Sequence, residues 1–167
     1  MWDRVIMVPG LRFQCGDMAE RQDIDRLEQA LGVTLPRSLG GFLREMDGCA
    51  VTLSGLEPPS SDKEMIKLIW SCEETLERNQ ALRRLDAETP DRTMTYADLL
   101  WFVEELDGIL VGFRVQHGKV AGPTVYSYEP GRGAEPCPRA GSLRQYLTEM
   151  VKDYQGKYSI DFDALGW

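Results

Sequence analysis

The stretch from residue 24 to residue 48 constrains the fold more than any other part of the sequence. Apolar residues recur at helical spacing in its first half, at Ile24, Leu27 and Leu31. Gly32 follows as a left-handed stop, and Pro36 suits the first turn of a second helix, where its missing N–H has no partner to lose. Each helix is too short to be stable alone, so the sequence predicts that the two pack together.

Polar residues and a glycine predict where these two helices begin and end. Asp17 and Glu20 have the spacing of a capping box, which predicts that the first helix begins near Met18. The second helix is expected to end at Gly48. Its apolar face consists of Leu39, Phe42, Leu43 and Met46.

The same stretch resembles the opening signature of the SUKH superfamily, which includes the yeast cell-wall-assembly regulators and many bacterial immunity proteins. That signature is an acidic helix ending in an apolar-Glu-x-x-Leu-Gly run, then Leu-Pro, then a helix that closes with an acidic or amide residue plus Gly. The matching residues are Leu27, Glu28, Leu31, Gly32, Leu35, Pro36, Leu39, Phe42, Leu43, Asp47 and Gly48. A generic helical hairpin is the alternative interpretation of this stretch taken alone.

Later segments extend the resemblance, in the right order, from about Trp2 to about Tyr154. They are an apolar-Trp strand at 68–70 leading into a helix at 73–82, strands at 99–102, 109–115 and 125–129, and a Ser-Leu-x-x-Tyr-Leu helix at 142–147. Two departures weaken the case for an inherited small-molecule pocket. Asp107-Gly108 stands where the superfamily often has Gly-Asp, and Tyr128 precedes Glu129 where it often has His.

Hydrophobic patterning predicts the remaining elements. Strands are expected at 50–53, 65–70, 99–103, 109–115 and 124–128, with turns at Gly118 and at Gly122-Pro123. A capping box at Ser71 and Glu74 opens a helix whose apolar positions are Cys72, Leu76, Leu82 and Leu85. The clearest amphipathic helix begins after Ser142, runs to Tyr154 and is expected to stop at Gly156. Connectors or irregular segments are expected at 11–16, 86–92 and 130–141.

These elements predict a single α+β domain over residues 1–167, in which helices flank a curved, mainly antiparallel sheet. Residues 1–16 are expected to form an N-terminal arm and residues 155–167 a C-terminal tail. The resemblance implies the same SUKH-like fold.

Composition narrows the classes of function. The net charge of −8 disfavours direct binding to nucleic acid or to an anionic membrane and favours a basic partner. No apolar run reaches the roughly 20 residues of a membrane span, and residues 1–13 lack a secretory signal pattern, so we expect a cytoplasmic protein. The scattered Cys15, Cys49, Cys72 and Cys137 are then expected to be reduced thiols rather than a disulfide frame or a zinc site.

The sequence offers little for catalysis. His117 is the one histidine, and it lies in an expected turn with no neighbour that would orient it as a base. Glu104, Glu105 and Asp107 crowd the turn after a core strand; a divalent cation could bind there, but a solvated acidic turn is the simpler interpretation. No cofactor or metal is expected.

The sequence therefore favours protein binding without catalysis. By resemblance, the chain is expected to be an immunity protein that neutralises a cognate bacterial toxin by occlusion, with a basic nuclease as a candidate toxin. A regulatory scaffold like the yeast members is the alternative, and a carboxylate-dependent hydrolase is a distant third. The expected partner-binding residues are Asp98, Glu104, Glu105 and Asp107.

Overall fold

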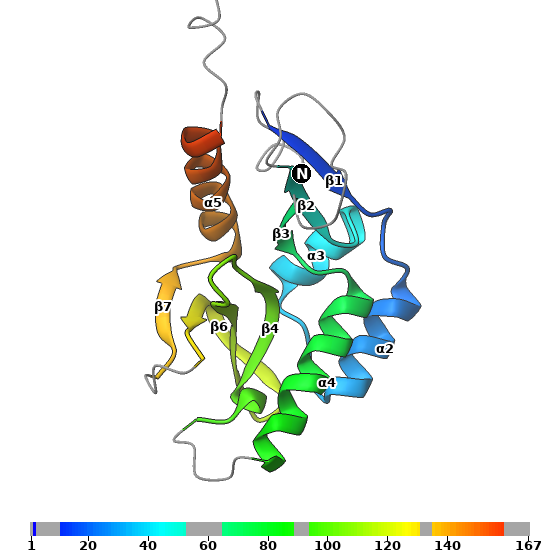
Figure 1. Ribbon diagram of the computed structural model, residues 1–167. Coiled ribbons are helices and arrows are strands. Elements are labelled where there is room, and N and C mark those ends of the chain that lie inside the picture. The colour runs from blue at the N-terminus through cyan, green and yellow to red at the C-terminus, as the bar shows by residue number, and fades with distance from the viewer. Residues whose placement is uncertain (1, 3–10, 53–64, 89–93, 131–134, 159–167) are drawn as a thin grey trace, which may run out of the picture.

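The structure of the chain is a computed structural model that describes residues 2, 11–52, 65–88, 94–130 and 135–158. These residues form an α+β fold with two antiparallel sheets and four α-helices, as Figure 1 shows, and this confirms the expected fold class. In chain order the elements are β1 (Arg12–Cys15), α2 (Arg21–Leu31), α3 (Arg37–Glu45), β2 (Cys49–Thr52), β3 (Met65–Ile69), α4 (Cys72–Glu88), the 3₁₀ helix η2 (Tyr96–Asp98), β4 (Leu99–Glu104), β5 (Leu110–Gln116), β6 (Lys119–Tyr128), β7 (Cys137–Ala140) and α5 (Leu143–Tyr158).

Helices α2 and α3 form the expected pair, but α2 begins later than the sequence suggested. The capping box uses Glu20 and Asp23 instead of Asp17 and Glu20. The reason is that the segment before α2 runs extended beside the end of α3. There the Asp17 carbonyl accepts the N–H of Asp47 at 2.7 Å, and the Ala19 N–H donates to the Leu43 carbonyl at 2.9 Å.

The first sheet has the strand order β1-β2-β3. The expected connector at 11–16 contains β1, because Arg12–Cys15 pairs antiparallel with β2. Cys15 lies directly opposite Cys49 in this register, and the two form a disulfide. The expectation of four reduced thiols is therefore wrong for this pair, whereas Cys72 and Cys137 are free.

The second sheet has the order β4-β5-β6-β7. Its first strand is buried from Leu99 to Val103, as expected for a strand covered on both faces. Two sequence expectations about the last two strands of this sheet, β6 and β7, are wrong. β6 continues through Gly122-Pro123, where a proline without an N–H is tolerated because β7 pairs only with residues 125–127. The strand β7 lies within the segment expected to be irregular.

Helix α4 joins the two sheets through a buried amide. Asn79 is fully buried; its Nδ2 donates to the Trp101 carbonyl at 2.7 Å, and its Oδ1 accepts the Trp101 N–H at 3.0 Å. The Trp70 N–H, just after β3, donates to the Phe102 carbonyl at 2.8 Å. The amide thus takes the place of a neighbouring strand beside β4.

The expected apolar face of α4 is wrong at Leu85, which is 40% exposed.

Helix α5 covers the second sheet with the expected face. Leu143, Tyr146, Leu147, Met150, Val151 and Tyr154 are all buried. Phe42 and Leu147 belong to one core, as the sequence predicted. The helix continues past Gly156 to Tyr158, so the expected stop is wrong.

The chain ends are described only in part. The backbone N–H of Trp2 donates to Glu45 Oε2 at 2.8 Å, and its ring meets Phe42 with centroids 5.7 Å apart. The rest of the expected N-terminal arm before residue 11 and the expected tail beyond Tyr158 lie outside the described residues.

Replacement of Leu147 by Ala is expected to lower the free energy of unfolding by about 2–5 kcal/mol, because it leaves a cavity under α5. A denaturant titration measures the loss. The exposed Leu106 provides the control, since Leu106→Ala should change stability by no more than about 0.5 kcal/mol. Equal effects of the two substitutions would contradict the docking of α5.

The disulfide predicts the thiol count of protein purified without reductant. Alkylation after unfolding should label Cys72 and Cys137 only, and all four cysteines after reduction. Because the bridge closes a sequence separation of 34, its loss is expected to cost roughly 4 kcal/mol of stability. Mass spectrometry and a denaturant titration test both statements, and labelling of four cysteines without reductant would refute the bridge.

Candidate protein-interaction site

A partly buried carboxylate holds the elbow between α2 and α3. Glu28 Oε1 accepts the N–H of Leu35 at 2.7 Å, which closes the loop that leads into Pro36. Gly32 ends α2 with φ of 63°, in the left-handed region that favours glycine. Arg83 of α4 donates from Nη1 to the Leu31 carbonyl at 2.7 Å, and so fastens the end of α2 to α4.

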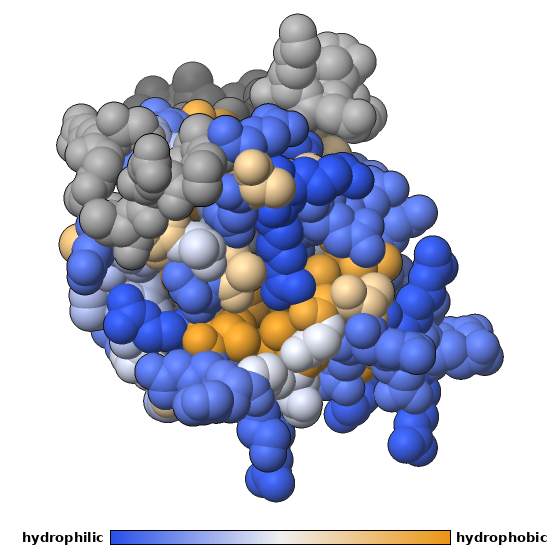
Figure 2. All heavy atoms as spheres, turned by 90° about the horizontal axis from the view of Figure 1, so that it is seen from below, coloured by the Kyte–Doolittle hydropathy of each residue, from blue (hydrophilic) through white to orange (hydrophobic). Residues whose placement is uncertain are grey.

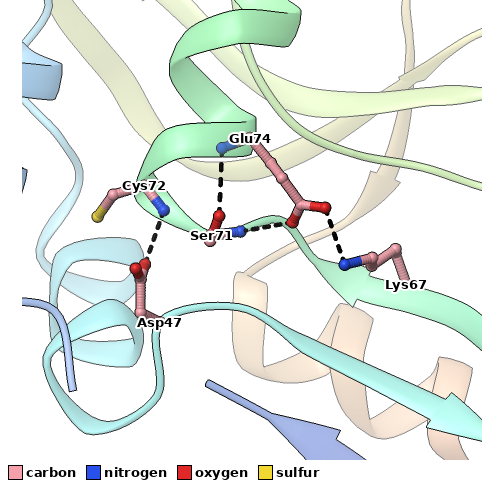
Figure 3. Close-up of polar contacts among 5 residues, drawn as sticks. All are labelled: Asp47, Lys67, Ser71, Cys72 and Glu74. Atoms are coloured by element: carbon pink, nitrogen blue, oxygen red, sulfur yellow. Dashed lines mark hydrogen bonds and ion pairs between the residues drawn. The ribbon is translucent and has the colours of Figure 1, made fainter. Parts of the chain in front are cut away.

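A second carboxylate holds the start of α4, as Figure 3 shows. Asp47 Oδ1 accepts the backbone N–H of Cys72 at 2.7 Å, one of the N–H groups that a helix start leaves without a helical partner. Gly48 follows with φ of 84°, and a Cβ there would lie 2.8 Å from the Ser71 nitrogen. The Asp-Gly pair therefore permits the close approach of the α3–β2 connector to α4.

The predicted capping box at Ser71 and Glu74 is confirmed. The Glu74 N–H donates to Ser71 Oγ at 3.1 Å, and Glu74 Oε2 accepts the Ser71 N–H at 3.0 Å. Lys67 on β3 lies 2.8 Å from Glu74 Oε1 (Figure 3). Burial raises the pKa of Glu74, but the contacts with Lys67 and Ser71 outweigh it, so the net shift of this pKa is downward.

These joints shape an acidic cleft between α2 and α4, with a volume of about 410 Å³. Its lining residues are Asp23, Arg26, Leu27, Asp47, Cys72, Glu73, Leu76, Glu77 and Gln80. Four of them are acids and one is a base. A concave surface with acids on both walls concentrates negative potential, which attracts a basic side chain of a partner.

The thiol in this cleft is poorly suited to catalysis. Cys72 is buried, and burial together with the nearby Asp47 carboxylate raises the pKa of its thiol far above the ordinary value. The reactive thiolate is therefore scarce near neutral pH. Among the described residues, no group of three or more His, Cys, Asp or Glu side chains could hold a metal ion.

Comparison with known families agrees with this arrangement. The model of the SMI1 / KNR4 family (SUKH-1) matches residues 18–149, which is most of the chain. The chain belongs to this family. The match confirms the resemblance drawn from the sequence, and the SUKH-1 family supports a protein-interaction role in general. No curated protein matches the chain.

The SUKH-1 signature residues form the framework and not the exposed surface. Leu27, Leu31, Leu39, Phe42 and Leu43 are buried, and the two signature carboxylates accept backbone N–H groups.

The structure separates the four acids that the sequence grouped. Asp98 precedes β4 and caps η2, where its Oδ2 accepts the Thr95 N–H at 2.9 Å. Glu104 ends β4, and Glu105 and Asp107 follow it, so these three acids lie roughly 20 Å from Asp98, at the other end of the strand. These acids cannot form one continuous patch with Asp98.

Within the turn, Glu105 is held by the protein itself. Its Oε1 accepts the Tyr146 hydroxyl at 3.2 Å and lies 3.8 Å from Arg139 Nε. Burial, and then the Glu105 charge, raises the pKa of Tyr146 well above its ordinary value. Glu104 and Asp107 remain exposed, and Leu106 between them is 61% exposed.

Sequence reasoning missed the cleft acids on α2 and α4, Asp23, Glu73 and Glu77. Their spacing looks like an ordinary solvated helix surface, and only the packing of α2 against α4 brings them together; the hydrogen bond from Arg83 to the Leu31 carbonyl is one contact of that packing. No described helix is long and apolar enough to cross a membrane.

Replacement of Asp47 by Ala is expected to lower the free energy of unfolding by about 1–2 kcal/mol, because it removes the acceptor at the start of α4. Asp47→Asn keeps an acceptor oxygen and should recover most of that loss. The control is Asp25→Ala, which removes an exposed pair with Arg21 and should cost at most about 0.5 kcal/mol. Denaturant titrations compare the three, and an equal loss for both alanine variants would contradict this role.

Proposed function

We propose that the chain is an immunity protein that neutralises a cognate bacterial toxin by covering its active site or substrate groove. The observation that carries the proposal is membership of the SUKH-1 family, joined to an acidic cleft built on the family framework. The net charge of −8 supports a basic partner.

The acidic cleft suits a toxin that acts on nucleic acid. A nuclease must hold phosphate, so it presents lysine and arginine side chains in a groove. Asp23, Glu73 and Glu77 are exposed on α2 and α4. Asp47 holds the start of α4, and the contact of Arg83 with the Leu31 carbonyl ties α4 to the end of α2. A basic side chain that would otherwise bind phosphate can enter the cleft, and the bulk of the immunity protein then blocks the groove.

The exposed acids of the β4–β5 turn form a second candidate contact. Glu104 and Asp107 face solvent on a turn held by backbone hydrogen bonds from Glu105 to Ile109 and from Gly108 to Glu105. Glu105 contributes the position of the turn and not a free charge. Asp98 belongs to a different part of the surface and would contribute only to a larger interface.

Cytoplasmic action fits this proposal, since an immunity protein must meet its toxin in the cell that makes both. A regulatory scaffold from the same family is the competing function. Co-expression separates them: the protein should restore growth to cells that produce the toxin encoded beside its gene. A scaffold would leave those cells unprotected.

Reversal of the cleft charges by Asp23→Lys, Glu73→Lys and Glu77→Lys is expected to slow association with the cognate toxin roughly tenfold or more at low salt. The difference should shrink near about 0.5 M salt, because exposed charges are then screened. Stopped-flow mixing measures both rates, and Glu104→Lys with Asp107→Lys tests the turn separately.

A matched control reverses acids elsewhere on the molecule. Glu88, Glu135 and Asp153 are exposed and do not line the cleft, so replacing all three with Lys matches the change in net charge without touching the cleft. Equal slowing by the same number of reversals at any site would indicate a net-charge effect. Unchanged rates for the cleft variant would remove the cleft from the interface while leaving the growth test to decide the function.

A further inference from the structure

An apolar groove with a basic rim lies beside the elbow between α2 and α3. Its volume is about 500 Å³. Its lining residues are Thr34, Leu35, Pro36, Arg37, Ser38, Lys119, Val120, Gly122 and Pro123. None of these described residues is acidic, although the chain as a whole carries a net charge of −8.

Backbone contacts fix the shape of this groove. The Thr34 N–H donates to the Gly118 carbonyl at 3.0 Å, and Thr34 pairs in parallel with Lys119. Arg37 at the start of α3 and Lys119 at the start of β6 lie on opposite sides of the groove, whose apolar lining includes Pro36 and Val120. Figure 2 shows the face on which α2 ends, where an apolar strip crosses an otherwise hydrophilic surface.

The β4–β5 turn has the opposite character. Leu106 stands at its tip with 61% of its surface exposed, between the exposed acids Glu104 and Asp107. Glu105 anchors the turn from below through Tyr146 and Arg139. The turn therefore presents the leucine to solvent in a fixed position. Because little of the turn has to become ordered on binding, the loss of conformational entropy is smaller.

The turn and the groove cannot meet within one molecule. The turn precedes Leu110 at the start of β5, whereas Lys119 pairs with Gln116 at the end of that strand. The seven residues of β5 place the two features roughly 20 Å apart, at opposite ends of the second sheet. A contact between them requires two copies of the chain.

We propose that the protein associates with itself head to tail, with the β4–β5 turn of one copy seated in the apolar groove of the next. Leu106 enters between Pro36 and Val120, and the acids on either side of it meet Arg37 and Lys119. The contact joins two different surfaces, so it is heterologous and leaves a free groove and a free turn at the ends. Its small size makes the association weak. This inference goes beyond the immunity function and does not depend on it.

Sedimentation equilibrium of the purified full chain tests the proposal from about 10 µM to about 1 mM. The weight-average mass of the wild type should rise with concentration, and less steeply at high salt. Leu106→Ala should lower the association constant roughly tenfold. Met18→Ala removes another exposed apolar side chain, 71% exposed and outside both features, and should leave the constant unchanged.

Two complementary variants test the direction of the contact. Arg37→Glu with Lys119→Glu destroys the groove rim, and Glu104→Lys with Leu106→Ala and Asp107→Lys destroys the turn. Each variant alone should remain monomeric. Their mixture retains one intact groove and one intact turn, and should form a 1:1 dimer that does not extend further.

Melting curves of all variants confirm that these exposed substitutions leave the fold intact. A wild-type mass that stays monomeric throughout, or a mass increase that survives both sets of substitutions, would overturn the proposal. A dimer in the mixture that persists when its remaining turn carries Leu106→Ala would place the contact elsewhere.

Discussion

The fold depends on the hydrogen bonds made by the edge of β4 that does not pair with β5. This strand is buried on both faces, so an unpaired N–H or carbonyl along its edge would cost free energy with no water to compensate it. Asn79 supplies one donor and one acceptor to the two backbone groups of Trp101, and Trp70 supplies a donor to Phe102. A helix side chain thus completes the ladder where a strand is missing. Because Asn79 sits on α4, it also fixes that helix, and with it one wall of the acidic cleft.

Two carboxylates of the family signature also satisfy backbone groups. Glu28 and Asp47 are acids by sequence, yet each accepts a backbone N–H and serves as a joint between elements. Pairing with a donor makes their partial burial tolerable. The acids proposed to meet a partner lie on the surfaces of α2 and α4 and on the β4–β5 turn. Asp23 among them also accepts the Glu20 N–H in the capping box of α2, so an acid can both support a helix end and remain exposed.

Periodic patterns made much of this architecture readable from the sequence. The face of α5 and the buried run of β4 follow from local repeats, and so does the capping box at Ser71. The short strands β1 and β7 did not, because they are largely exposed edges whose pairing depends on distant residues. The Cys15–Cys49 bridge was missed for the same reason. Of the four acids expected to form a site, Glu104 and Asp107 are exposed on the same turn. Glu105 points inward to Tyr146, and Asp98 lies at the other end of β4. The order of residues in an irregular turn does not reveal which side chains face solvent.

The pairing of the two sheets also has a consequence for the route by which the chain reaches this structure. In the second sheet Glu104 pairs with Leu110, and Gln116 with Lys119, so hairpin closure there brings together residues near in sequence. In the first sheet Cys15 pairs with Cys49 across a sequence separation of 34, and the loop that must close contains both α2 and α3. Loop-closure entropy penalises the second event more than the first. We therefore expect the β4–β6 meander to form before β1 pairs with β2, so that the first strand of the sequence joins its sheet after later strands have already paired.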